Sequence, residues 1–190
     1  MDRTTIETYN QIAAEYDREV ADFWKRHESQ LINKFVSAAG PKILDIGCGS
    51  GRDAIILSNN GKDVLCLDAS DAMVQICKSK GLAATCADYH VIPYNDVTFD
   101  GVWAYTSILH SPKAEIVKVV QEIRRVLCPD GVLALGLIEG DYEGYRNSAG
   151  PDLLRWFSFY NKSEIEKIFS MGGFKINYFE EMVLDSKKYL

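Results

Sequence analysis

The chain has 190 residues, of which 47% are hydrophobic and 25% are charged, and its formal net charge at pH 7 is −6. This length and balance predict an ordinary globular protein that can bury a proper core. The acidic balance argues against nucleic acid as a partner, because nucleic-acid binding requires a basic face. No apolar run approaches the length of a membrane span, so we expect no membrane association.

Cysteine usage and the N-terminus indicate the compartment. Five cysteines, an odd number without a C-x-x-C pair, stand at positions 48, 66, 77, 86 and 128. Cys66 and Cys86 lie inside apolar runs, which predicts buried thiols in a reducing environment. The first ten residues lack the apolar region of a signal peptide. We therefore expect a cytoplasmic protein.

The N-terminal forty residues predict a helical segment. Ile6, Tyr9, Ile12 and Tyr16 recur at helical spacing and share one face. The apolar stripe continues to residue 36, and the Gly-Pro pair at 40–41 ends the segment.

Strands and helices then alternate. Apolar runs predict strands at residues 42–47, 63–68, 83–88, 99–106 and 131–140, with helices between them at 52–61, 70–81 and 112–127. Strict alternation with short loops predicts right-handed crossovers and a mostly parallel sheet with helices on both faces. The expected fold class is α/β, a Rossmann-like three-layer αβα sandwich with an N-terminal helical lid.

The alternation stops after residue 140. We expect an irregular, aromatic-rich insertion at 141–160, then a helix at 161–173 and a last strand at 174–184. The whole chain is predicted to be a single domain over 1–190, made of a lid at 1–40, a core at 41–138, a substrate-side insertion at 139–160 and a terminal helix and strand at 161–190.

Acidic side chains stand at the ends of three successive predicted strands. Asp45, Asp68 and Asp88 occupy these positions, and a glycine-rich stretch follows the first of them. Ligands of open parallel sheets bind beyond the carboxyl ends of the strands, at the point where the strand order reverses. The three acids are therefore expected to form a row along the rim of a ligand site.

The glycine stretch favours a cationic nucleoside over a dinucleotide. Gly47, Gly49 and Gly51 alternate with other residues instead of following the G-x-G-x-x-G spacing, and Asp45 precedes them. A carboxylate there would repel a pyrophosphate but suits a ligand with a positive end. Asp68, 23 positions after Asp45, can accept bonds from both ribose hydroxyls. The expected ligand is adenosine-like, positively charged and without phosphate.

Four segments resemble motifs of the class I S-adenosylmethionine-dependent methyltransferases: "ILDIGCGSG", "LDAS", "CADY" and "FDGVWAYTSILH". A fifth, "YNQIAAEYD", resembles the N-terminal helix of the subgroup that includes ubiquinone- and menaquinone-biosynthesis methyltransferases. The resemblance covers residues 6–138 and the "GGF" ending. It implies S-adenosyl-L-methionine as cofactor, S-adenosylhomocysteine as product and methyl transfer to a small-molecule acceptor through an O, N or C atom.

The resemblance also implies site residues. Asp45 and the glycine loop would line the methionine end of the cofactor, Asp68 would hold the ribose, Asp88 would accept from the adenine amino group, and Tyr9 and Tyr16 would close over the cofactor as a lid. The full implied cofactor-binding set is Tyr9, Tyr16, Asp45, Gly47, Cys48, Gly49, Asp68, Ala69, Met73, Asp88, Tyr89 and Ala104.

Structural roles compete with several of these assignments. The glycines could serve only a tight turn between strand and helix, although the flanking acids favour the functional reading. Asp88 could cap the following loop. Tyr9 and Tyr16 could be core residues of an amphipathic helix, and Met73 suits the core better than a cofactor contact.

The substrate side is predicted from the end of the fourth strand and from the insertion. His110 follows that strand and resembles a histidine found there in the subgroup, so it is the candidate base or orienting group; bonding the loop before Pro112 is its structural alternative. The expected substrate residues are Tyr105, Arg146, Arg155, Trp156 and Tyr160. Their composition favours a flat or partly anionic small molecule, although packing of the insertion onto the sheet explains many of its aromatics.

Other functions stay open at this stage. A nicotinamide-dependent reductase has a similar sheet, but the loop spacing and Asp45 argue against it. A non-catalytic subunit that binds S-adenosylmethionine or a partner is a further alternative, since no strong closing strand is evident. Methylation of RNA is disfavoured by the acidic balance. The sequence leaves a homodimer open and indicates no metal.

Overall fold

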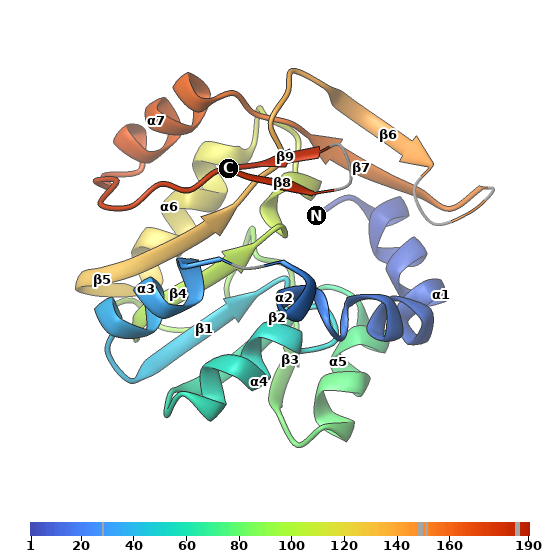
Figure 1. Ribbon diagram of the computed structural model, residues 1–190, viewed down its shortest axis with the longest axis horizontal. Coiled ribbons are helices and arrows are strands. Elements are labelled where there is room, and N and C mark those ends of the chain that lie inside the picture. Colours follow the sequence, from blue (N-terminus) through green and yellow to red (C-terminus); the bar gives the residue numbers. More distant parts are fainter. Residues whose placement is uncertain (28, 148–149, 151, 185–186) are drawn as a thin grey trace.

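A computed structural model describes residues 1–27, 29–147, 150, 152–184 and 187–190. A parallel five-stranded sheet forms its centre, in the order β3-β2-β1-β4-β5 (Figure 1). The strands are β1 (Lys42–Ile46), β2 (Asp63–Asp68), β3 (Ala83–Cys86), β4 (Phe99–Tyr105) and β5 (Leu127–Gly136). All five predicted core strands are present, and β5 begins four residues earlier than expected.

Helices cover both faces of the sheet, which confirms the three-layer prediction. One apolar cluster joins the sheet to α6 (Ile116–Val126) and α7 (Lys162–Met171). A second cluster on the opposite face joins it to α3 (Leu31–Ala38), α4 (Arg52–Asn59) and α5 (Asp71–Ser79). The central strand β1 is buried from Ile43 onward, as expected of a strand covered on both sides.

Local sequence explains where these helices begin and which side they bury. Ser70 caps α5, because its hydroxyl accepts from the backbone N–H of Met73 at 3.2 Å. Helix α6 buries Ile116, Val119 and Ile123 at helical spacing. It begins four residues after the predicted opening at Pro112, because residues 113–115 form a turn.

The described residues of the N-terminal segment form three helices. They are α1 (Arg3–Val20), the short α2 (Phe23–Arg26) and α3. Packing explains the break: the Arg52 guanidinium lies 4.5 Å from the ring centre of Phe23, and the indole of Trp24 donates to Asp53 at 2.6 Å. These contacts require the chain to leave the line of α1, and tertiary packing overrides local helix propensity.

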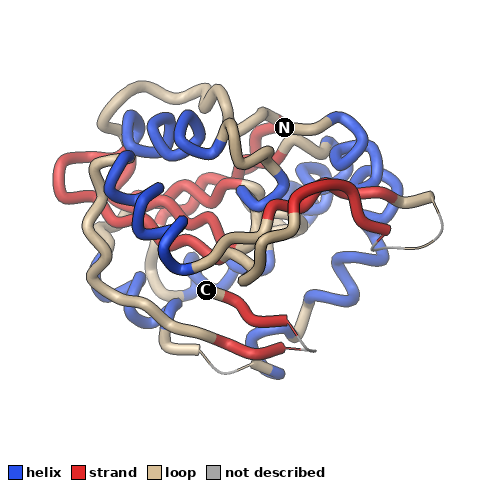
Figure 2. The backbone as a smooth tube through the Cα atoms, turned by 90° about the horizontal axis from the view of Figure 1, so that it is seen from above, coloured by secondary structure: helices blue, strands red, loops and turns tan. Residues whose placement is uncertain are grey.

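The insertion predicted to be irregular is a β-hairpin. Its strands β6 (Glu143–Asn147) and β7 (Leu154–Ser158) are antiparallel and lie beside α1 (Figures 1 and 2). Side chains of α1 join the backbone of β7: Thr8 donates to the carbonyl of Leu154 at 2.7 Å, and Thr5 accepts from the N–H of Trp156 at 2.8 Å. The hairpin therefore holds one side of the N-terminal helix.

The predicted last strand at 174–184 is largely absent. Residues 174–181 form no strand, and β8 (Met182–Leu184) pairs with β9 (Lys187–Tyr189) in a separate two-stranded sheet. Leu190 makes two backbone bonds with Leu137, so the end of the described chain lies beside the extension of β5. No helix of the described residues is both long and apolar enough to cross a membrane.

Candidate functional site

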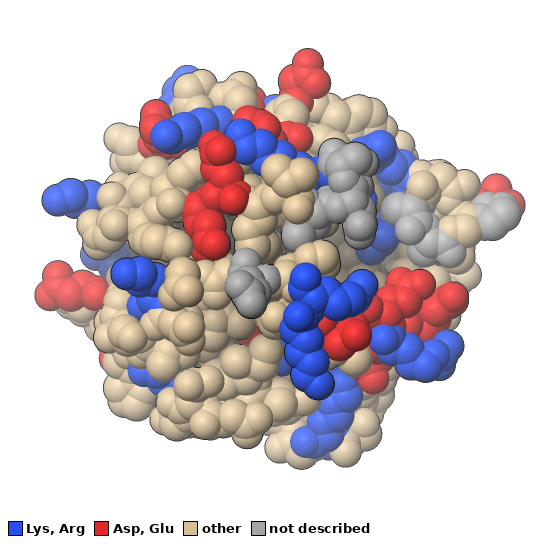
Figure 3. Space-filling model, in the orientation of Figure 1, with Lys and Arg blue, Asp and Glu red and all other residues tan. Residues whose placement is uncertain are grey.

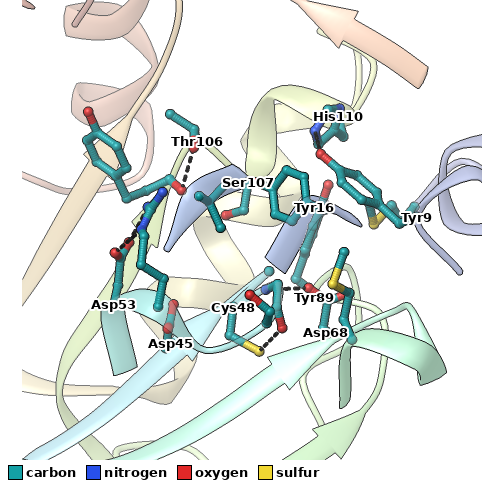
Figure 4. A pocket seen from close by; sticks show the side chains of 18 residues that line it. Tyr9, Tyr16, Asp45, Cys48, Asp53, Asp68, Tyr89, Thr106, Ser107 and His110 are labelled. Atoms are coloured by element: carbon teal, nitrogen blue, oxygen red, sulfur yellow. Dashed lines mark hydrogen bonds and ion pairs between the residues drawn. The ribbon is translucent and has the colours of Figure 1, made fainter. Parts of the chain in front are cut away.

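A cavity lies at the point where the strand order reverses. The chain runs from β1 outward through β2 and β3, then returns to place β4 on the other side of β1. The carboxyl ends of β1, β2 and β4, the 3-10 turn η1 (Ile108–His110) and helix α1 surround a cavity of about 50 Å³ (Figure 4). Ligands of such sheets bind at this position.

The glycine loop forms one wall and needs glycine for two reasons. Gly47, Gly49 and Gly51 have φ values of +61°, +53° and +83°, where side chains are disfavoured. A Cβ on Gly47 would also lie 2.3 Å from the Cβ of Ser107. The loop is fastened to β2, since the N–H of Gly49 donates to Asp68 at 2.8 Å. The backbone is thereby held at the cavity edge.

Three carboxyl groups line this cavity. Asp45 is 2% exposed, and burial, reinforced by the charge of Asp53, raises its pKa well above the usual range. Burial raises the pKa of Asp68 to about 6, against the opposing effect of amide donors such as Ser70. Asp53 accepts two bonds from Arg52. The wall is therefore acidic. Asp68 and Asp53 accept hydrogen bonds from neighbouring groups, whereas Oδ2 of Asp45 has no partner among the described residues.

Four buried polar atoms on this wall have no hydrogen-bond partner among the described residues. They are Asp45 Oδ2, Ser50 Oγ, Tyr105 OH and Ser107 Oγ. A buried polar group without a partner costs about 1–3 kcal/mol, so their concentration in one cavity indicates a ligand site. Hydroxyl acceptors and donors beside a buried carboxyl fit a ligand that carries both a cation and polar groups.

Two tyrosines of α1 cover the cavity. The rings of Tyr9 and Tyr16 lie 5.5 Å apart, edge to face. Arg155 of the hairpin donates to the Tyr9 hydroxyl at 2.8 Å, and that hydroxyl lies 2.8 Å from His110 Nε2. The helix is also fixed to α5, because the amide oxygen of Asn10 accepts from the Ser70 hydroxyl at 2.7 Å. These contacts hold the covering helix on both sides.

His110 is buried and held at both ring nitrogens. Its Nδ1 lies 2.6 Å from the carbonyl oxygen of Trp156, which can only accept, so the proton is assigned to Nδ1. Nε2 then accepts from the hydroxyl of Tyr9. Burial lowers the pKa of His110 to about 3, so the ring is neutral at physiological pH.

The structure brings most of the predicted cofactor residues to the cavity and leaves three outside its wall. Tyr9, Tyr16, Asp45, Gly47, Cys48, Gly49, Asp68, Met73 and Tyr89 line it, together with the predicted substrate residue Tyr105 and with His110. Ala69, Asp88 and Ala104 are not among the residues that line it. Asp88 instead bonds the N-terminal amino group and His90, and these contacts hold its pKa below the usual range against the effect of burial. Met73 is 1% exposed, which agrees with its alternative as a core residue.

A wider groove of about 650 Å³ lies on the outer side of the tyrosines. It shares Tyr9, Tyr16 and His110 with the inner cavity and adds Arg155 and Phe157 of the hairpin. Of the other predicted substrate residues, Trp156 contributes its carbonyl to His110.

Two predicted substrate residues lie elsewhere. Arg146 lies on the rings of Tyr142 and Phe159 and lines neither the cavity nor the groove. Tyr160 is buried, with Lys113 over its ring, and also lines neither. Both side chains pack within or beneath the hairpin, so the packing alternative suits them better.

Sequence reasoning missed a buried network around Asp53. The indoles of Trp24 and Trp103 donate to this carboxylate at 2.6 and 2.9 Å, and Arg52 pairs with it. An acid in the first turn of the helix that follows the glycine loop was the available signal. Thr106, which also lines the cavity, has a φ of +58°, a conformation of a non-glycine residue that sequence does not reveal.

Comparison with known proteins agrees with this geometry. Residues 44–135 match the family described as a methyltransferase domain. The methyltransferase GfsG of Streptomyces halstedii is 34% identical over 61% of this chain and 44% of its own length. The 27-O-demethylrifamycin SV methyltransferase of Amycolatopsis mediterranei is 36% identical over 52% of this chain and 39% of its own length. The chain thus spans less than half the length of these two relatives.

A solved structure shows the same fold. A S-adenosylmethionine-dependent methyltransferase from Methanosarcina mazei matches with a TM-score of 0.76 at 17% identity, over 86% of this chain and 95% of that chain. The sequence matches and the shared fold support the resemblance of this chain to the class I S-adenosylmethionine-dependent methyltransferases. The family resemblance of the sequence motifs is thereby confirmed.

Proposed function

We propose that this protein transfers a methyl group from S-adenosylmethionine to a small-molecule acceptor. The observation that carries the proposal is the set of partnerless buried polar atoms on an acidic cavity at the reversal of the strand order. Asp45 suits the cationic methionine end, and Asp68 lies where a ribose-binding carboxylate is expected. The named activities of the curated relatives support the same class of reaction.

The residues of the chain would act mainly by positioning. S-adenosylmethionine, when bound, supplies an already activated methyl group, so transfer depends on alignment of the acceptor and exclusion of water. Tyr9 and Tyr16 stand between the inner cavity and the outer groove, where they can separate cofactor from solvent. We infer that the groove receives the acceptor.

The inner cavity requires α1 to move when the cofactor binds. At about 50 Å³ it is far smaller than the roughly 300–1,000 Å³ of typical ligand sites. Helix α1 and the first residues close it from one side. We therefore infer that the described structure is a closed form and that the N-terminal helix opens and recloses around the cofactor.

His110 is better suited to position Tyr9 than to remove a proton. A general base works best with a pKa near the operating pH, whereas that of His110 is about 3 and its acceptor nitrogen is already bonded. We expect His110→Gln and wild type to show the same acidic limb of kcat/KM between pH 5 and 8. If the wild type shows an acidic limb near pH 6.5 and His110→Gln lacks it, His110 acts as a general base.

The acceptor is inferred from the groove. Arg155 and Phe157 place a guanidinium and an aromatic face beside the tyrosines. Such a pair suits a planar molecule with a carboxylate, because arginine binds carboxylates through paired hydrogen bonds. Nucleic acid is disfavoured as a substrate: cationic and anionic side chains are interspersed over the face in Figure 3, and the net charge is −6.

The proposal is tested by turnover. Purified protein is incubated with S-adenosylmethionine and a panel of aromatic carboxylates, phenols and amines, and S-adenosylhomocysteine is measured. The proposal is supported if formation of S-adenosylhomocysteine requires an acceptor and is slower in Arg155→Leu than in the wild type. Cofactor binding without turnover on any acceptor would favour the second candidate, a non-catalytic binding subunit, which is supported by the main sheet's having five strands among the described residues.

A further inference from the structure

Three cysteine thiols converge beneath the glycine loop. Cys48 belongs to that loop, Cys66 to β2 and Cys77 to α5. Their sulfur atoms all lie within 4.8 Å of one another, and the sulfurs of Cys48 and Cys77 are 3.8 Å apart. All three side chains are buried, so three separate elements bring soft donor atoms to one point.

The spacing of the sulfurs matches that of a metal site. Thiolate–metal bonds are about 2.3 Å long for zinc, and three sulfurs at that distance from one ion lie about 4 Å apart. Thiolates are the ligands preferred by soft ions such as Cu⁺ and by Zn²⁺. The cluster therefore has the ligand number, ligand type and size of a three-sulfur site.

We propose that Cys48, Cys66 and Cys77 form a binding site for a soft, thiolate-seeking metal ion under the glycine loop. The route to the site is the inner cavity, since Cys48 lines it while Cys66 and Cys77 have no exposed surface. The sulfurs of Cys48 and Cys77 contact the carbonyl oxygen of Gly49 at 3.5 and 3.2 Å as donors, and they give up these contacts when they become thiolates.

Binding must release protons. When the ion enters, three sulfur–metal bonds form, and each sulfur that still carries a proton releases it to solvent as its S–H bond breaks. Metal affinity therefore rises with pH. The ordinary alternative is that the three thiols only pack the core.

The test uses the folded chain and Cd²⁺ as the probe, under argon with a phosphine reductant. A Cys86→Ser, Cys128→Ser background removes the two remaining cysteines, which lie outside the cluster. We expect one Cd²⁺ per chain, with sulfur-to-metal charge-transfer absorption and proton release that are unchanged by this background. X-ray absorption at the cadmium edge should show three sulfur neighbours around the ion. This measurement leaves the three cysteines of the cluster unchanged.

Single substitutions then test each ligand. In that background, Cys48→Ala and Cys66→Ala should weaken Cd²⁺ binding by more than about 100-fold, because loss of even an outer-shell partner costs roughly 10–100-fold. Circular dichroism checks that each variant is folded. The proposal is overturned if the folded background binds no Cd²⁺, if its Cd²⁺ has fewer than three sulfur neighbours, or if binding disappears with Cys86 and Cys128. The outcome does not depend on the proposed methyl transfer.

Discussion

Asp68 is the residue whose ionisation links the fold to cofactor binding. Its carboxylate ends β2, accepts from the backbone of Gly49 and Ser70, and faces the cavity. Burial raises its pKa to about 6. A carboxyl whose folded-state pKa is raised holds its proton below that value, so the form that can accept two ribose hydroxyls is present only above about pH 6.

The affinity for S-adenosylhomocysteine should therefore fall by about tenfold for each pH unit below 6. Asp68→Asn should weaken binding at pH 7.5 by roughly 10–100-fold, since charge-assisted bonds contribute about 1.5–3 kcal/mol. Asp71 is an exposed neighbour in the first turn of α5, and Asp71→Asn is the matched control. It should change neither the affinity at pH 7.5 nor its dependence on pH. Calorimetric titrations from pH 5 to 8 measure both, and a pH-independent affinity would remove Asp68 from the site.

Gly47 carries a steric demand that Gly61 does not. Both have positive φ values, +61° and +80°, but a Cβ on Gly61 meets nothing within 4 Å while one on Gly47 collides with Ser107. Gly61→Ala should cost about 1–2 kcal/mol for the left-handed backbone alone. Gly47→Ala should cost a further 1–3 kcal/mol or so from overpacking. Urea unfolding of the two variants measures the difference in their free energies of unfolding. Equal losses of stability would show that the loop rearranges around the added Cβ at no cost.

At the scale of elements, α1 is held as a cover by side chains rather than by sequence-adjacent structure. Asn10 bonds Ser70 and the N–H of Ala72 on one side, and Thr8 bonds Leu154 on the other. These attachments are hydrogen bonds of single side chains, which suits an element that must open and reclose. The side-chain bonds that hold α1 over the cavity would therefore also control the proposed entry of the cofactor.

Asn10→Ala should loosen this cover. Loss of two hydrogen bonds at a partly solvated site costs about 1–2 kcal/mol, so we expect S-adenosylhomocysteine to dissociate roughly 5–30-fold faster and the melting temperature to fall by about 2–8 °C. Gln11→Ala, an exposed position on the same helix, is the control. Stopped-flow dissociation with excess competitor gives the rates; identical rates in both variants would show that α1 does not gate the cavity.

Elements of the core could be predicted because each strand and helix has its own periodic pattern. The terminal regions could not. "FKINYFEEMVL" alternates as a strand does, yet alternation says which face is apolar and not whether a neighbouring strand is there to pair. Residues 141–160 contain a Gly-Pro pair but not the Asn-Gly or Asp-Gly pair of a two-residue hairpin loop, so the register of Tyr145 opposite Trp156 has no local signal.

For the whole molecule, the position of Asp45 and Asp68 at the edge of the sheet could be predicted from the sequence, but the side-chain contacts around the site could not. Strand-end position alone brings Asp45 and Asp68 to one cavity. The pairing of Asp53 with two indoles, and the distance of Arg146 from the groove, depend on contacts between segments far apart in the chain. Long-range side-chain geometry is set by tertiary packing, which one sequence does not display.

The central claim is that the cavity at the reversal of the strand order binds S-adenosylmethionine. Isothermal titration with S-adenosylhomocysteine, repeated in buffers of different ionisation enthalpy and with NADH as control, tests it most directly. We predict one site per chain with micromolar affinity and net proton release, because the ligand's ammonium group should lower the raised pKa of Asp45. A folded protein that binds neither compound, or binds NADH equally well, would contradict the account.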